Sequence, residues 1–496
     1  MWILFPNQLF SQEQLATIPY WKKETYVLWE DPLFYGIRPD SKASKGSLKL
    51  NQLRIVYQKW LWLNYIDYLK SLHLSIQIIP FEELSSFTTS FKKIKTLVAS
   101  SSSPIQCFDP EDAVLKQRWR SLPIEWKDSP MFLTTQAQLE EYMRLTASNK
   151  QMQHRHFYQY VKNTVLKRMF PSVNIPDSKD SENRKPIPND FKLPELPYNS
   201  TSISTSLPKN LQLAFEWSQR HFPKNPGPTN LLETVQRYLV QLPSNVSQAE
   251  SWWKKYRQTR FSLFGPYEDA MVSSQPILFH SFSAMLLNFG LLTPAFILQD
   301  LLYHYQFNKG GKEQNASLEG FIRQVAGWRE YSRLYYRKVS PNIYHQNPFE
   351  QKGKLTKEWY STTVRSSNTN SLPPLVQEAI HDAWNTGYLH HIRRLMVVSN
   401  YMNLNGIHPM NVYKWMYEFS LDSWEWVMVF NVYSMGTWSD KGYAMRKPYI
   451  SSPNYLLKMS DTPSGPWVAS WKSQYDAFLK NHTSILKHTI YAYQLK

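Results

Sequence analysis

The chain has 496 residues with a single cysteine, and its 56 lysines and arginines outnumber 39 aspartates and glutamates, giving a net charge of +17. One thiol forms no internal disulfide and no cysteine-ligated metal cluster, which argues against a disulfide-stapled secreted scaffold and favours a reducing, cytoplasmic compartment. The charge favours a polyanionic partner, nucleic acid or an acidic membrane surface, although it is also compatible with simple solubility. No run of about 18 apolar residues occurs, so we expect no membrane-spanning helix.

Residues 1–130 have the pattern of an α/β domain. Short apolar runs ended by polar, turn-like residues predict four strands, and apolar residues at helical spacing predict a helix over Leu53–Leu72. Strands alternating with helices indicate a doubly wound parallel sheet. The predicted strands are Met1–Phe5, Glu24–Trp29, Ser75–Ile79 and Thr96–Ala99.

Beyond residue 130 the pattern changes. We predict a helical connector and linker over 131–208, because 170–208 contain many prolines and charges and no apolar period. Residues 209–496 are mainly helical between proline and glycine breaks, which predicts a large all-α C-terminal domain. Neither a G-x-G-x-x-G turn after a strand nor a Walker loop occurs, so a nucleotide cofactor would need another architecture.

One long helix is predicted in the C-terminal half, over Val376–Asn403. Gly406 and Pro409 follow it in the order expected of a helix end and the first turn of the next helix, which should run to about Phe419. Asp422 is placed to cap the segment after that.

The histidine pair His390 and His391 is the first candidate for chemistry. Adjacent helical residues point about 100° apart, so the two rings should not form a metal site by themselves. His390 and Arg394 share a helical face, and a histidine beside a guanidinium can act as a general acid or base. Spacing alone favours the alternative of two ordinary hydrogen-bonded histidines.

Aromatic residues are concentrated within 24 positions after residue 414. They could donate single electrons to an excited cofactor, but core filling is the stronger interpretation from composition alone. The cluster comprises Trp415, Tyr417, Trp424, Trp426, Tyr433 and Trp438.

Two basic segments could follow a phosphate backbone. Basic residues interleaved with aromatic ones suit a phosphate track with stacking platforms, and a solvated helix face is the alternative. The segment His280–Pro294 could bind phosphate oxygens at a helix N-terminus or be an ordinary capped core helix. The basic residues are Arg323, Arg329, Arg333, Arg337 and Lys338, then Lys441, Arg446 and Lys447 beside Tyr443 and Tyr449.

Several motifs, in the same order along the chain, resemble the cryptochrome/photolyase superfamily. Together they are similar to the bacterial branch whose members usually carry an iron–sulphur cluster and repair (6-4) photoproducts, and the resemblance covers essentially the whole chain. The motifs are Asn7–Leu9, Asn183–Pro186, Phe264–Met271, Leu278–Ser281, Asn288–Pro294, Gly327–Tyr331, His390–Val397 and Lys447–Asp461.

The resemblance implies an N-terminal antenna domain and a helical domain that holds U-shaped FAD, acting as a monomer on ultraviolet-damaged DNA. Excited reduced FAD would pass an electron to the lesion, His390 would transfer a proton, and His391 and Tyr449 would position the flipped base. The flavin would be lined by His280, Ser281, Ser283, Asn288, Arg394, Asn400, Asp422 and Asn431.

Three further residue sets follow from the same resemblance. Electrons would travel through Trp415, Trp424, Trp359 and Tyr360. Trp328 would form part of the lesion pocket wall, and we group it with Arg329, Arg446 and Lys447 as the DNA-binding set. The branch often carries 6,7-dimethyl-8-ribityllumazine as antenna, for which Asn7, Gln8, Glu30 and Tyr35 are the candidates.

The sequence also departs from this branch. The positions of the four cluster cysteines hold residues that cannot ligate iron, so we expect no iron–sulphur cluster and no other metal. Met416 replaces a redox-active aromatic residue, and Met428 stands where relatives often have an acid. A cryptochrome-like photoreceptor, a cyclobutane-dimer photolyase and a cofactor-free nucleic-acid-binding scaffold remain alternatives. The four cluster positions are Leu375, Pro463, Pro466 and Ala469.

Overall fold

The computed structural model describes residues 1–493 apart from 42–43, 85, 150, 177–184, 189, 200, 308 and 362–371. Part of one sequence motif, Asn183 and Arg184, therefore lies outside the described residues. Among the helices that are described, none is both long and apolar enough to cross a membrane.

The N-terminal domain is built on a five-stranded parallel sheet with strand order β5-β2-β1-β6-β7. The central strand β1 is fully buried, and its Ile3 pairs with Val27 on one side and Cys107 on the other. This arrangement confirms the predicted doubly wound sheet, because the chain leaves β1 first toward one edge and then toward the other. The strands are β1 Trp2–Leu4, β2 Thr25–Trp29, β5 Ser75–Ile79, β6 Ile105–Phe108 and β7 Ile124–Lys127, with a separate hairpin of β3 Asp40–Ser41 and β4 Ser44–Lys45.

One predicted strand is wrong. Thr96–Ala99 belongs to helix α3 (Phe87–Ser100), whose N-cap Ser86 accepts a hydrogen bond from the Thr89 N–H. The buried residues of α3, Ser90 and Ile94, are four apart, so helical spacing outweighs the local strand preference of a short run. The strand that the sheet needs is β6, and the predicted helix is confirmed as α2 (Gln52–Ser71).

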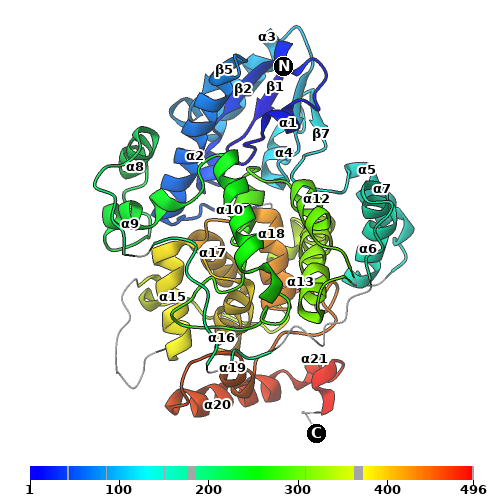
Figure 1. Cartoon of the computed structure of the whole chain (residues 1–496), viewed down its shortest axis with the longest axis vertical. Coiled ribbons are helices and arrows are strands. Elements are labelled where there is room, and N and C mark those ends of the chain that lie inside the picture. Colours follow the sequence, from blue (N-terminus) through cyan, green and yellow to red (C-terminus); the bar gives the residue numbers. More distant parts are fainter. Residues whose placement is uncertain are drawn as a thin grey trace.

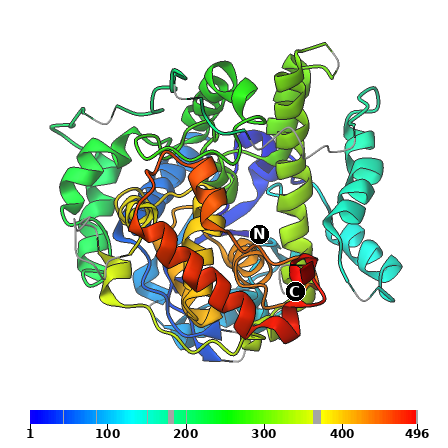
Figure 2. The same cartoon turned by 90° about the horizontal axis from the view of Figure 1, so that it is seen from below.

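Helices make up the remainder of the chain (Figure 1). The sheet forms one end of the molecule, and α19, α20 and α21 form the opposite end, where Figure 2 shows α20 crossing the domain. The connector helices α5–α7 lie at one flank, while α8 packs along α2 of the first domain. The helices are α1 Gln12–Leu15, α4 Ala113–Trp119, α5 Gln136–Leu145, α6 His154–Val161, α7 Lys167–Met169, α8 Lys209–His221, α9 Leu231–Arg237, α10 Val246–Thr259, α11 Ala284–Asn288, α12 Pro294–His304, α13 Lys312–Ile322, α14 Arg329–Val339, α15 Pro374–Thr386, α16 Asn400–Leu404, α17 Pro409–Phe419, α18 Glu425–Val429, α19 Pro453–Met459, α20 Pro466–Asn481 and α21 Thr483–Leu486.

Several α-helices continue into a wider, π-helical turn. These segments are η4 Lys162–Leu166, η8 Arg323–Trp328, η11 Arg393–Ser399 and η12 Phe430–Gly436. The division of the chain at residues 130 and 208 stays a prediction, although β7 ends at Lys127 and α8 begins at Lys209.

The long helix predicted over Val376–Asn403 is interrupted at Gly387. This glycine ends α15 in the left-handed conformation, with φ of +65°, and the helix resumes only at His391. The predicted order of glycine and then proline between the two helices is confirmed. Gly406 precedes α17, and Pro409 is the first residue of α17. Tyr388–His390 therefore form a connection between helices rather than a stretch of helix.

Buried ion pairs join α14 to the sheet domain. Arg333 donates to Glu111 at 2.5 Å, and Arg337 contacts both Glu111 and Asp109 in the loop after β6. Burial raises the pKa of Glu111, but the guanidinium groups of Arg333 and Arg337 outweigh it and hold the pKa at about 2. The prediction that these two arginines follow a phosphate backbone is therefore wrong, since both are used inside the protein.

Replacing Glu111 by Gln should destabilise the protein by about 3–5 kcal/mol, because the change leaves the fully buried Arg333 without its countercharge. The Glu111 carboxylate contributes its stability above its ordinary pKa of 4.5 and loses it as the pH falls toward about 2, so the variant should also be less acid-sensitive in that window. Urea unfolding at several pH values measures both effects. Glu83→Gln, in an exposed pair with Lys93, is the matched control and should cost less than about 1 kcal/mol. Equal losses in the two variants would contradict the argument.

Candidate functional site

Three histidines from two distant segments converge in the helical domain. One ring nitrogen from each of His280, His390 and His391 lies within 4.8 Å of the others. The rings of His280 and His390 are stacked with centroids 4.5 Å apart, and His391 meets His280 edge-on at 5.3 Å. The sequence linked His390 and His391 to the lesion and His280 to the flavin, whereas the structure places all three in what we call the histidine cluster.

Local backbone conformation explains this convergence. Leu278 and Phe282, on either side of His280, both have positive φ, so the chain turns tightly around that histidine. Phe282 then packs against Tyr388 with ring centroids 4.5 Å apart, which fixes this turn against the connection after Gly387. The prediction that His390 and His391 do not form a metal site by themselves assumed that both lie in one continuous helix. The break at Gly387 removes that assumption.

Burial keeps the cluster uncharged. His280 and His390 are buried, while the side chain of His391 is 44% exposed and its Nε2 lies 3.7 Å from Glu268 Oε1. Desolvation, followed by neighbouring positive groups, lowers the pKa of His280 and His390 well below the usual value, and it lowers the pKa of His391 to about 4. Among the described residues, neither Nε2 of His280 nor Nδ1 of His390 has a hydrogen-bond partner.

A continuous line of polar contacts involves three of the predicted flavin-lining residues. Arg394 pairs with Asp422 at 2.9 Å, and the Asn288 side-chain N–H donates to the Asp422 carbonyl at 2.6 Å. Arg329 extends the line by donating to Asn288 Oδ1 and to the Met131 carbonyl. Asp422 does not cap a helix as predicted, because its carboxylate is used by Arg394 and Ser420 and α18 begins after Trp424.

The other predicted flavin-lining residues have local partners. The Ser283 N–H donates to Ser281 Oγ at 3.2 Å, just before α11. Asn400 is fully buried and accepts from the Ser451 N–H at 3.1 Å, and Asn431 donates to the Val427 carbonyl one turn earlier. Asn400 therefore anchors the loop before α19, a contact that sequence reasoning missed.

The structure adds one residue to the predicted electron-transfer set. Buried Trp384 lies 6.2 Å from Trp415 and 5.5 Å from Tyr360, measured between ring centroids. Trp384 and Trp415 both donate their indole N–H to the Trp359 carbonyl, at 2.8 and 2.7 Å. Sequence reasoning missed Trp384 because it is four residues after Ile380 and fits the apolar face of α15.

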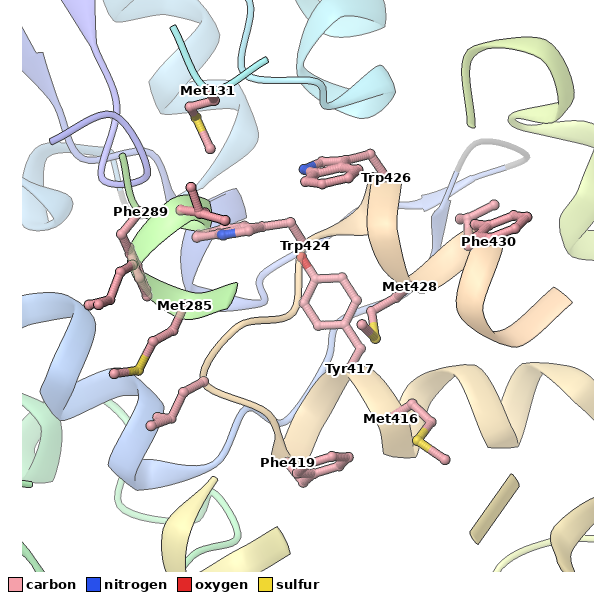
Figure 3. Close-up of a cluster of buried hydrophobic side chains, with 14 of the residues drawn as sticks. Met131, Met285, Phe289, Met416, Tyr417, Phe419, Trp424, Trp426, Met428 and Phe430 are labelled. Carbon is pink, nitrogen blue, oxygen red and sulfur yellow. The ribbon is translucent and has the colours of Figure 1, made fainter. Parts of the chain in front are cut away.

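Trp424 belongs to a different aromatic group. Its ring packs edge-on to Phe34 and Phe289, with the Arg54 guanidinium 4.8 Å away. Figure 3 shows Trp424 turned toward Phe289, whereas Met416 extends from α17 on another side of the cluster. Trp415 instead contacts Phe419, at 4.8 Å.

The antenna candidates lie in the sheet domain. Tyr35 donates to Glu30 at 2.5 Å, and Lys59 pairs with the same carboxylate at 2.6 Å. Gln8 donates to the Phe108 carbonyl, while the buried amide of Asn7 has no hydrogen-bond partner among the residues described. Glu30 and Tyr35 thus form one sealed cluster, and their antenna role stays a prediction.

The residues predicted to contact DNA occupy varied positions. Trp328 is half-buried and stacks on His154 at 3.7 Å, and Arg329 points inward as described above. Arg446 is exposed, Lys447 is partly exposed and Tyr449 is half-buried in the loop before α19. Of the four former cluster positions, Leu375 is buried in α15 and the others are exposed near the start of α20.

Comparisons with known proteins agree with this architecture. A family model described as deoxyribodipyrimidine photo-lyase-related protein matches residues 2–231. The (6-4) photolyase of Agrobacterium fabrum is 32% identical over 284 residues, which cover 57% of this chain and 51% of the relative. The alignment thus spans about half the length of that photolyase. An uncharacterised mimivirus protein, R855, is 51% identical over 85 residues, covering 17% of this chain and 69% of the relative.

Solved structures share the fold. A class III photolyase from Agrobacterium tumefaciens superposes with a TM-score of 0.54 at 12% identity, covering 96% of this chain and 86% of that one. A Synechocystis cryptochrome gives a TM-score of 0.54 at 13% identity, with coverage of 99% and 88%. A doubly wound sheet domain followed by a large helical domain is the architecture these proteins share. These similarities support the cryptochrome/photolyase superfamily as the family that this chain resembles.

Members of this superfamily generally bind FAD, and the donor groups of the polar line fit such a molecule. Desolvation lowers the pKa of Arg329 to about 10, and the nearby Glu330 carboxylate only partly opposes this effect. The buried guanidinium donates to the neutral oxygens of Met131 and Asn288. A buried cation of this kind suits a diphosphate. The adjacent Arg394 and Asp422 supply a donor and an acceptor that suit a flavin ring or its sugar chain.

The uncharged histidines predict a pH-dependent stability. The pKa of His280 and His390 is lower in the folded than in the unfolded chain, so the unfolded chain binds more protons and stability should decline as the pH falls below about 6.5. Urea unfolding between pH 7.5 and about 5, below the ordinary histidine pKa, measures the slope. His390→Gln should flatten it. An unchanged slope in the variant would refute the neutral, buried state of this ring.

Proposed function

We propose that this protein repairs (6-4) photoproducts in ultraviolet-damaged DNA, using light and bound FAD. The observation that carries the proposal is the histidine cluster, in which half-exposed His391 lies in front of buried His390 beside the Arg394–Asp422 pair. Reversal of a (6-4) photoproduct must return a proton and a hydroxyl or amino group between two bases, and an imidazole can transfer that proton. The 32% identity to a (6-4) photolyase and the net charge of +17 support the same function.

FAD, when bound, would supply the photoexcited electron. Arg329 and Asn288 would hold its diphosphate, and Arg394 with Asp422 would orient the ring, in keeping with the contacts these side chains already make. The hydroxyl groups of Ser281 and Ser283 are further donors at the start of α11.

The two lesion histidines would have different tasks. His391 is the half-exposed ring and would meet the extruded base, while buried His390, edge-on to His391 with ring centroids 6.2 Å apart, would supply the proton. Both rings are neutral in the free protein, so the proton must be gained when damaged DNA enters. Phosphate charge near the cluster would favour this, because a nearby negative charge raises the pKa of an imidazole.

Defined oligonucleotides that carry either a (6-4) photoproduct or a cyclobutane dimer test the proposal. Illuminated, reduced protein should restore the first lesion and leave the second unchanged. His390→Asn should slow restoration at least about 100-fold, the usual size of a lost general acid–base contribution, while lesion binding is retained. His391→Asn should weaken lesion binding and slow restoration, because it removes the ring that meets the extruded base. Gln474→Asn, on the distant helix α20, is the control and should repair normally. Restoration of the dimer alone would refute the substrate assignment, and restoration of neither would favour a photoreceptor.

We further propose that the flavin is photoreduced through Trp415, Trp384 and Tyr360. Trp415 is buried beside Phe419, over which the Arg394 guanidinium lies at 5.4 Å, and Tyr360 is 40% exposed and can meet an external reductant. Trp359, 5.9 Å from Trp415, offers a branch of the same route. The centroid separations of 6.2 and 5.5 Å along the route support transfer between neighbouring rings.

Trp384→Phe and Trp415→Phe should each slow photoreduction at least about tenfold, an expected barrier increase of roughly 1.4 kcal/mol. The decay of oxidised flavin absorbance under blue light with excess thiol gives the rate. Trp424→Phe tests the alternative donor, and Trp119→Phe, buried in the sheet domain, is the control for loss of an indole. Unchanged rates in both Trp384→Phe and Trp415→Phe would rule out this route.

A further inference from the structure

The histidine cluster has the composition of a transition-metal site. Its three potential ligand atoms are all imidazole nitrogens, lying within 4.8 Å of one another. In a tetrahedral zinc site, Zn–N bonds of about 2.0–2.1 Å place the ligand atoms about 3.3 Å apart. The ring nitrogens therefore have to approach one another by up to about 1.5 Å, with some reorientation of the stacked His280 and His390 rings, and the half-exposed His391 side chain has room to move.

Two of the nitrogens are buried and have lone pairs to offer. His280 hydrogen-bonds to the backbone of Glu268, while its Nε2 has no partner among the described residues. The backbone bond is therefore made through Nδ1, which leaves the Nε2 lone pair available, the arrangement typical of metal-binding histidines. Nδ1 of His390 is likewise buried and without a partner in the described part of the chain.

We propose that His280, His390 and His391 form a binding site for a divalent transition-metal ion, with Zn²⁺ the best-suited cation. Imidazole nitrogens prefer zinc and its neighbours over Mg²⁺ or Ca²⁺, which take oxygen ligands. Three protein ligands leave a fourth position for water on the exposed side of His391, as in zinc sites that remain open to solvent.

The surrounding charges permit a cation. The guanidinium groups of Arg393 and Arg394 are nearby, but Asp382 and Asp422 pair with them at 2.5 and 2.9 Å. Arg260 and Arg323 also act on the rings of His280 and His391, and Arg323 pairs with Glu319 at 3.5 Å. Glu268 lies against His391 at 3.7 Å and is held by Gln324 at 2.8 Å. This carboxylate can accept the second N–H of a metal-bound imidazole, which orients the ring and strengthens the ligand.

Metal binding would compete with repair, a consequence that rests on the proposed function. A nitrogen lone pair bound to Zn²⁺ cannot accept a proton, so the loaded cluster cannot perform the proton transfer assigned to His390. The same three rings would then allow either lesion chemistry or metal binding, but not both at once.

Equilibrium dialysis of the tag-free, full-length protein against Zn²⁺, in the dark and without DNA, tests the site. Metal content by mass spectrometry should approach one tightly bound ion per chain, and X-ray absorption should show three imidazole ligands. His391→Asn and His390→Asn should each weaken binding at least about tenfold, since even loss of a supporting partner costs that much. His488→Asn, an exposed histidine near the C-terminus, is the matched control and should bind normally.

Undiminished affinity in both His390→Asn and His391→Asn would overturn the proposal, as would a zinc shell without imidazole nitrogen. If the His280→Asn variant fails to fold, the His391→Asn variant still tests the proposal, because the side chain of His391 is half-exposed. In a repair assay, one equivalent of Zn²⁺ should suppress (6-4) restoration and a chelator should recover it. Zinc binding in a protein that repairs neither lesion would support the metal site and refute the proposed function, so the two failures are distinguishable.

Discussion

The left-handed turn at Gly387 is the constraint on which the candidate site depends. Its φ of +65° and its close approach to Leu421 both require glycine, because an added Cβ would lie 2.6 Å from the Leu421 side chain. The Leu421 N–H donates to the Gly387 carbonyl at 2.9 Å, which fixes the end of α15 beside Asp422. One turn thus releases Tyr388–His390 from the helix and brings the following residues to the Asp422 carboxylate.

Buried ion pairs and hydrogen bonds join the two domains. Arg38 pairs with Asp112 at 2.7 Å and with Glu425 at 3.0 Å, which ties the sheet domain to α18. The Asn51 side chain caps α2 and also donates to the Trp384 carbonyl, which ties the sheet domain to α15. Arg329 and the histidine cluster differ, because their polar groups face neutral atoms or have no described partner. Uncompensated buried polarity is costly, so these groups are candidates for contact with a ligand.

The proposed repair and metal-binding activities would use the same property of the cluster. Nε2 of His280 and Nδ1 of His390 are buried without a partner in the described residues, and such a nitrogen could bind either a metal ion or a proton. The proposed electron route does not depend on the histidine cluster. It consists of closely packed aromatic rings that also stabilise the helical domain. Core packing and electron transfer need the same geometry at Trp384 and Trp415, so composition could not separate them.

Much of the architecture was predictable from local pattern. Apolar runs predicted three of the five sheet strands, α2 and the start of α17 at Pro409, because strand burial and helix-start chemistry depend on neighbouring residues. Ordered motifs predicted the superfamily and singled out His390 and His391. Only the tertiary structure decided that Arg333 and Arg337 are internal and that His280 joins the other two histidines. The physical reason is distance along the chain: these outcomes depend on partners such as Glu111, Leu421 and Tyr388, whose positions no local pattern of residues encodes.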